Sequence, residues 1–233
     1  MLIFGTWQAA AGTIVDATYI GRPTSVITAW WALAASGELW ANAQYTLFEF
    51  ALGFAAGAIA GVLAAVALTV IELPYRICEP FLLVLYGIPM IVLGPLLTLW
   101  FGVGPLPKIA LAALATFLLV VMNTVAGIQT TNPQMVALLR VMGARRIPLN
   151  RKLVLPHALP YALTALRLAI PLAMVGTILG EFLGAAHGLG HMIEEQATFL
   201  AVNKMMAGVA TIAVAVMFFR ALLTPLEKWA NRF

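Results

Sequence analysis

The chain has 233 residues, of which 63% are hydrophobic and only 9% are charged, and its mean hydropathy is +0.99. Soluble domains are about 45–50% apolar, so this composition excludes an ordinary soluble domain and predicts a surface that faces lipid. The net charge of +4 does not indicate nucleic-acid binding, because the basic residues mostly lie between hydrophobic runs, and the single cysteine, Cys78, excludes an intramolecular disulfide and a cysteine-based metal cage.

The first 45 residues are predicted to contain no complete membrane span. Residues 1–15 form an apolar run that is shorter than the ~20 residues a span needs, so the N-terminal helix is expected to be shortened. Residues 24–41 are amphipathic and contain Trp30, Trp31 and Trp40, which suit the headgroup layer. We expect this segment to be a helix lying on the outer interface, with a short additional core helix as the alternative.

Five later runs have the ~17–25 apolar residues that can cross a bilayer. They cover about residues 46–71, 81–102, 107–128, 161–183 and 205–224. Each is predicted to be a helix, because a span must satisfy its own backbone hydrogen bonds. In the first run, Gly53, Gly57 and Gly61 recur every fourth residue and predict a face that packs against another helix. No internal repeat is evident, which favours a pathway formed between two copies of the chain.

The distribution of basic residues predicts the orientation. The loop at 129–160 holds the cluster Arg140, Arg145, Arg146, Arg151 and Lys152. Cytoplasmic loops carry an excess of Lys and Arg, so this loop is expected to face the cytoplasm. Segments 16–45 and 184–204 then face outside, each with one basic residue, Arg22 and Lys204.

Signals for an enzyme are weak. His187 and His191 are four residues apart, as metal ligands on a helix can be, but Gly188 and Gly190 lie between them and disfavour a regular helix. No metal site is predicted. The sequence has no Walker A loop, so this chain is not expected to hydrolyse ATP by that route.

Charged residues within predicted spans are functional candidates by default. Glu49 and Arg220 lie near the ends of spans, where their side chains are expected to reach the interface. Arg167 and Glu181 share one predicted helix and are fourteen residues apart, which is nearly four turns, so both lie on about the same face. They are the candidates for the translocation path; the alternative is that each is a structural group bonded to a neighbouring helix.

The loop at 132–156 contains a short predicted helix with an apolar stripe. Asn132 and Pro133 form a helix-start signal, and Met135, Leu138, Leu139 and Met142 then follow at helical spacing. Gly143 is expected to break this helix, with a positive φ, and a second short basic helix is expected to end before Pro156. An apolar stripe on a cytoplasmic helix requires a partner that covers it.

This loop resembles the cytoplasmic signature loop of ATP-binding-cassette (ABC) importer permeases. Gly143 is followed after nine residues by Leu153-Val154-Leu155-Pro156, as in the family pattern of Gly, nine residues and Ile-x-Leu-Pro. Further resemblance lies in Ile88-Pro89, Trp100-Phe101-Gly102-Val103-Gly104, Ala165-Leu166-Arg167, Gly180-Glu181 and Gly188-Leu189-Gly190. The resemblance covers about residues 20–233 and is greatest to the nitrate, sulfonate and taurine branch. The family's Glu-Ala-Ala falls on Ala137-Leu138-Leu139, so its acidic residue is absent here, and Glu49 stands where relatives often carry a basic residue.

The resemblance implies an all-α membrane protein, a single permease domain over 1–233 with five to six transmembrane helices of the type I importer kind. Its loop at about 132–156 would be the coupling helix that docks on a separate ATPase subunit. The residues implied in that contact are Met135, Leu138, Leu139, Met142, Gly143, Ala144, Leu155 and Pro156. ATP would bind to the partner, and this chain would bind no cofactor and no nucleic acid.

The implied function is transport, with no catalysis by this chain. An external solute-binding protein would deliver a small solute, an anion such as a sulfonate or nitrate, to a homodimer in the bacterial inner membrane. The alternatives are a permease for a heterocyclic vitamin precursor and, from different classes, a passive channel or a polytopic membrane enzyme. A channel would need no ATPase, and an enzyme would need clustered His, Asp or Glu inside the spans.

Overall fold

A computed structural model describes residues 2–11, 17–71 and 75–230, and its regular elements are helices. In chain order they are α1 (Leu2–Ala10), α2 (Ala17–Ile20), α3 (Pro23–Ala35), α4 (Glu38–Ile71), α5 (Tyr75–Gly87), α6 (Met90–Phe101), α7 (Pro105–Gln129), α8 (Pro133–Val141), α9 (Arg146–Leu149), the π-helix η1 (Asn150–Val154), α10 (Leu155–Phe182), α11 (Leu189–Thr198) and α12 (Val202–Ala230). The expected all-α membrane fold is confirmed.

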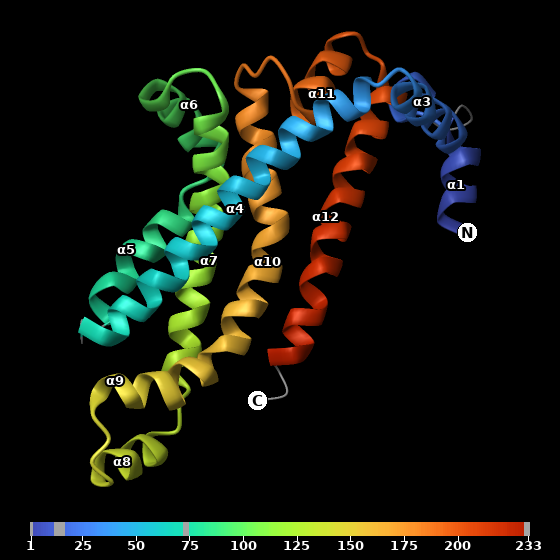
Figure 1. Cartoon of the computed structure of the whole chain (residues 1–233). Coiled ribbons are helices and arrows are strands. Elements are labelled where there is room, and N and C mark those ends of the chain that lie inside the picture. Colours follow the sequence, from blue (N-terminus) through green and yellow to red (C-terminus); the bar gives the residue numbers. More distant parts are fainter. Residues whose placement is uncertain (1, 12–16, 72–74, 231–233) are drawn as a thin grey trace.

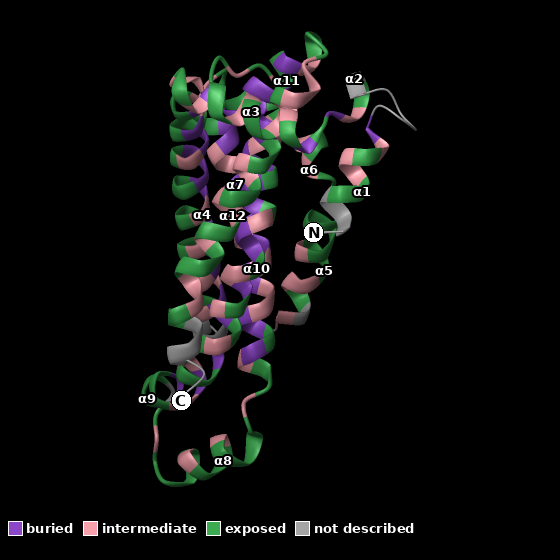
Figure 2. Cartoon of the chain, turned by 90° about the vertical axis from the view of Figure 1, so that its right-hand side faces the viewer, coloured by how far each residue is buried: buried purple, intermediate pink, exposed green. Residues whose placement is uncertain are grey.

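The long helices α4, α7, α10 and α12 form the body of the molecule (Figure 1). Among the described residues, four helices are long and apolar enough to cross a membrane, and a fifth span results if α5 and α6 are counted together. Buried residues concentrate on α7 and α10, which lie at the centre, whereas the outer faces of α4 and α12 are exposed (Figure 2). The exposed faces are apolar, as expected for helices whose solvent is lipid.

The predicted glycine face of α4 does pack against protein. A Cβ at Gly53 would lie 2.6 Å from the Cβ of Ala112, and one at Gly61 would lie 2.8 Å from the Cβ of Val120, both on α7. At Gly57 a Cβ would meet the backbone carbonyl of Ala113. The three glycines therefore allow α4 and α7 to approach at backbone distance, as small residues do between membrane helices.

The predicted span at 81–102 is not one straight helix, and that prediction is wrong in this respect. α5 and α6 meet at a bend of 93° around Ile88 and Pro89. Pro89 has no N–H to continue the helical ladder, and its ring disfavours a helical conformation at Ile88. The apolar run is continuous in the sequence, but in the structure it forms two helices that meet at Pro89.

The N-terminal segment also differs from the prediction. The expected interfacial helix at 24–41 ends at Ala35, Gly37 turns the chain with φ 81°, and Trp40 belongs to the first turn of α4. α3 packs on the bundle by one face, where Leu33 is buried and the Trp30 indole N–H donates to the Thr211 hydroxyl at 3.0 Å. Its other face is exposed, with Trp31 as its largest side chain. α3 is therefore a surface helix with one packed face, and its position in the headgroup layer stays a prediction.

Candidate functional site

The loop at 132–156, predicted to be cytoplasmic, contains the predicted short helix, α8, with the predicted N-terminal cap. The Asn132 side chain accepts a hydrogen bond from the Gln134 backbone N–H at 2.9 Å, and Pro133 occupies the first helical position. This bond satisfies one of the backbone donors that a helix start leaves unpaired. None of the α8 residues is buried, and the helix lies beyond the ends of α7 and α10 (Figure 1).

Gly143 ends α8 in the way the sequence predicted. Its φ is 82°, in the left-handed region. The Gly143 N–H donates to the Arg140 carbonyl at 3.0 Å, and the Ala144 N–H donates to the Leu139 carbonyl at 2.9 Å. These two bonds are those of a Schellman motif, which requires a left-handed residue after the helix and therefore favours glycine. A Cβ at Gly143 would meet no atom within 4 Å, so the need for glycine within this chain is conformational.

The apolar stripe of α8 is exposed, as required for a docking surface. Met135, Leu138 and Met142 are 53%, 59% and 73% exposed, and Leu139 is half-buried. Two residues that the sequence analysis omitted are more exposed still: Val141 at 87% and Ile147 at 74%. Val141 follows Leu138 by three residues, so the helical spacing already indicated that Val141 lies on the same face as Leu138. We call Met135, Leu138, Val141 and Met142 the exposed face of α8.

The expected second helix does not end before Pro156. α9, η1 and α10 follow one another without a break, and Pro156 is the second residue of α10. The π-helical turn allows the chain to stay helical up to Pro156. The Leu155 N–H donates to the Asn150 carbonyl, and the N–H that Pro156 lacks is one that the first turn of α10 leaves unpaired in any case. Leu155 and Pro156 are therefore at the base of the loop, whereas the exposed face of α8 lies at its far end (Figure 1).

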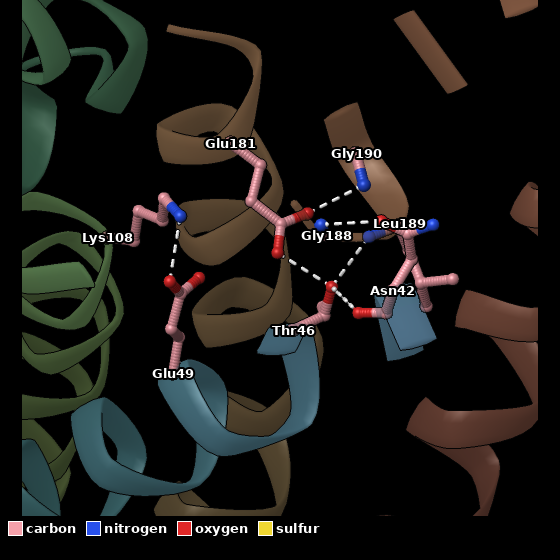
Figure 3. Close-up of polar contacts among 8 residues, drawn as sticks. All are labelled: Asn42, Thr46, Glu49, Lys108, Glu181, Gly188, Leu189 and Gly190. Carbon is pink, nitrogen blue, oxygen red and sulfur yellow. Dashed lines mark hydrogen bonds and ion pairs between the residues drawn. The ribbon is translucent and has the colours of Figure 1, made fainter. Parts of the chain in front are cut away.

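At the other end of the bundle, Glu181 holds the beginning of α11. Its side chain is fully buried and accepts hydrogen bonds from the Thr46 hydroxyl at 2.6 Å and from the Gly190 N–H at 2.6 Å (Figure 3). The Thr46 hydroxyl accepts from the Leu189 N–H at 2.8 Å, and the Asn42 side chain accepts from the Gly188 N–H at 2.9 Å. Three side chains from α4 and α10 thus satisfy the free N–H groups of a helix start, where negative charge is also favourable.

The Gly188-Leu189-Gly190 sequence is explained by the same contact. A Cβ at Gly188 would collide with the Glu181 carboxylate, and one at Gly190 would lie 2.8 Å from its Oε2 atom. Glycine at both positions lets the backbone approach the carboxylate. Asn42 and Thr46 were not predicted as site residues. In the sequence each is an ordinary polar residue, and its role follows only from the packing of α11 against α4.

Replacing Glu181 with glutamine should destabilise the end of the bundle at which α11 packs. Glu181 accepts from two donors, whereas a glutamine amide has one acceptor and would direct its NH₂ group at the other donor. Leaving a buried donor unpaired costs about 1–3 kcal/mol, which should lower the thermal unfolding temperature of the protein in lipid nanodiscs. Glu194→Gln is the matched control, because Glu194 is exposed on α11. Equal melting of Glu181→Gln and the parent would show that the contact contributes no stability.

A second charged group that the sequence analysis omitted pairs with Glu49. The Lys108 Nζ lies 2.7 Å from the Glu49 Oε1, and these side chains are only 8% and 3% exposed. The prediction that Glu49 reaches the interface is therefore wrong: it is buried between α4 and α7 (Figure 3). Lys108 lies within the predicted span at 107–128. Because charged residues inside spans pair with one another, this position already indicated that Lys108 has an acidic partner.

The ion pair lies beside a cavity of about 380 Å³ between α4, α6, α7 and α10. Its lining includes Glu49, Lys108, Thr98, Tyr45 and His187. The His187 ring stacks on Tyr45 at a centroid distance of 4.8 Å, and the described residues contain no group of three metal-ligating side chains. Neither Glu181 nor Arg167 lines this cavity. Arg167 is half-buried on α10, about 21 Å along the helix from Glu181, so the structure does not bring these two candidates together.

A broken span, a bundle with an apolar outer surface and a protruding loop are the features of a membrane-embedded subunit. A solved inward-facing structure of the MetNI methionine ABC transporter has the same fold, with a TM-score of 0.68 at 20% identity over 81% of this chain and 94% of that one. The chain belongs to the family of binding-protein-dependent transport system inner membrane components, whose model matches residues 57–232. It is the permease subunit of an ABC importer.

Two relatives illustrate the branch. The putative aliphatic sulfonates transport permease protein SsuC of Bacillus subtilis is 32% identical over 100% of this chain and 86% of its own length. The taurine transport system permease protein TauC of Escherichia coli is 27% identical over 96% of this chain and 84% of its own length. The resemblance to the sulfonate and taurine branch is thereby confirmed.

Proposed function

We propose that this permease carries a small organic sulfonate across the bacterial inner membrane. The sulfonate and taurine relatives, each aligned with nearly the whole chain, support this solute class. A solute-binding protein delivers the solute to the outer face, and two permease copies form the path. The ATP is bound and hydrolysed by a separate ATPase subunit.

The observation that best supports a contact with the ATPase is the exposed face of α8. It presents Leu138, Val141 and Met142 on a helix outside the membrane-spanning bundle, and the Schellman turn at Gly143 fixes its direction. Exposing these apolar side chains to water is unfavourable in free energy, and a protein partner that covers them removes this penalty. Leu155 and Pro156 support this contact from the base of the loop, by setting where α10 begins.

The helices connect the loop to the outer end. From Arg146 to Phe182, α9, η1 and α10 form one uninterrupted helical segment. The Thr130 hydroxyl lies 3.2 Å from the His157 ring, which ties the end of α7 to the beginning of α10. A movement imposed on α8 by the ATPase is transmitted through these rigid elements toward the cavity beside Lys108. Glu181 influences the translocation path indirectly, by positioning α11. Arg167 lies on α10, between the loop and the outer end.

Reconstitution tests the proposal directly. The permease, its ATPase and its binding protein are placed in proteoliposomes, and uptake of radiolabelled taurine and of an alkanesulfonate is measured with and without ATP. We expect ATP-dependent accumulation of at least one sulfonate, and competition by the unlabelled compound. ATP-independent flux would indicate a channel, and accumulation of a heterocyclic vitamin precursor in place of a sulfonate would assign the permease to a different solute.

A further inference from the structure

The cytoplasmic loop carries uncompensated positive charge. The sequence contains no Asp or Glu from residue 80 to residue 180, so the loop has no acidic side chain with which its five basic residues could pair. Four of these are described and exposed: Arg140, Arg145, Arg151 and Lys152. Ala137, on α8, is also exposed. The loop therefore presents an apolar face together with positive charge alone.

The charges fall into two groups by their distance from the bilayer. The Thr130–His157 contact marks the base of the loop, and α7, with 25 residues, extends from there for about 37 Å. The hydrocarbon core is only ~30 Å thick, so α7 is long enough for this base to reach the level of the headgroups. Arg151 and Lys152 are in η1, close to the base, and suit anionic headgroups. Arg140 is in α8, at the far end of the loop (Figure 1), and Arg145 lies between α8 and α9.

Arg140 and Ala137 border the exposed face of α8. Residues three and four apart are neighbours on a helix, so Ala137 lies beside both Arg140 and Val141. A surface that covers Leu138 and Val141 must pass close to the Arg140 guanidinium. If that surface were basic or neutral, the arginine would lose water without gaining a partner, which is unfavourable.

We infer that the loop docks into an ATPase groove with an apolar floor and carboxylates along its edge. This inference rests on the proposed function, because it concerns the same contact, and it adds the charge of the partner. Arg140 and Arg145 face the carboxylates, while Leu138, Val141 and Met142 enter the groove. Opposite charges on two surfaces accelerate association, and salt weakens this effect because the screening length falls from about 10 Å at 0.1 M to about 3 Å at 1 M.

Binding kinetics test the charge of the groove. The permease is held in nanodiscs of uncharged phosphatidylcholine, and association of its cognate ATPase subunit is measured at low and high salt. Arg140→Glu with Arg145→Glu should slow association by about tenfold or more at low salt and reduce its salt dependence. Lys204→Glu is the control, because Lys204 is exposed at the opposite end of the bundle and undergoes the same change of charge as each of the two arginine substitutions.

Ala137→Glu provides a second, independent variant. A carboxylate at this exposed position should slow ATPase association relative to Ala137→Gln, which adds the same volume without charge. In addition, Arg140→Lys keeps the positive charge and supplies an amine that a carbodiimide can join to a carboxylate in contact with it. Mass spectrometry should then identify a cross-link from residue 140 to an Asp or Glu of the ATPase.

The outcomes separate the inference from the proposed function. No ATPase binding by the parent protein would overturn both. Normal binding with no salt dependence, and with unchanged association in the Arg140→Glu/Arg145→Glu and Ala137→Glu variants, would overturn the acidic groove alone. A salt effect that appears only when phosphatidylglycerol is added to the nanodiscs would assign the charges to lipid headgroups and would also contradict the inference.

Discussion

Replacing Lys108 with methionine should cost about 3–5 kcal/mol of folding stability, because it leaves the buried Glu49 carboxylate without its counter-ion. Glu49 is 3% exposed, so water has little access to solvate the unpaired charge. Methionine retains most of the length of the lysine side chain, so packing against Gly180 is largely preserved. Thermal unfolding in nanodiscs, followed by circular dichroism or by loss of monodisperse protein, measures the effect.

The double variant Glu49→Gln/Lys108→Met separates the lost charge from the lost packing. Removing both charges should recover most of the stability, because a buried ion pair contributes little compared with uncharged groups of similar shape. Lys204→Met is the control for loss of an exposed lysine. If the single Lys108→Met variant melts like the parent, the carboxylate has another partner and the pair is not needed for folding.

Replacing Gly143 with valine should weaken the proposed docking on the ATPase by about tenfold while leaving membrane insertion unchanged. A side chain at φ 82° costs about 1–2 kcal/mol, and β-branched residues are the least tolerant of this region. The Schellman turn would open, and the Leu139 and Arg140 carbonyls would lose their bonds to the backbone. Because the loop lies outside the bundle, the stability of the membrane-spanning helices should not change. Co-purification with the ATPase and ATP hydrolysis by the complex measure docking.

Asparagine at the same position distinguishes two reasons for the glycine: the positive φ of the turn, and close approach of the ATPase surface. Asn tolerates the left-handed region better than other residues with a side chain, so Gly143→Asn should keep the turn. Since a Cβ at Gly143 meets nothing within this chain, docking by Gly143→Asn should be close to that of the parent. If asparagine disrupts docking as strongly as valine, the ATPase surface itself approaches residue 143. If neither does, the turn is not part of the contact.

The sequence by itself determined the features that depend on neighbouring residues. Long apolar runs can cross a membrane only as helices, so the spans containing α4, α7, α10 and α12 were predictable. The beginning and end of α8 were predictable because Asn132, Pro133 and Gly143 act on the backbone within a few residues of themselves. The glycine face of α4 was predictable as a packed face, since its period is that of a helix, but the identity of its neighbour was not.

Only the tertiary structure decided the contacts between residues far apart in the chain. Glu49 and Lys108 are 59 residues apart, and Glu181 and Thr46 are 135 apart, so no local pattern could have paired them. The continuity of α9, η1 and α10 through Pro156 depends on a π-helical turn, which propensity rules do not predict. The division of 81–102 into α5 and α6 depends on whether packing favours a kink or a break at Pro89. Buried charges and prolines have several solutions in a bilayer, and the packing of neighbouring helices selects one of them.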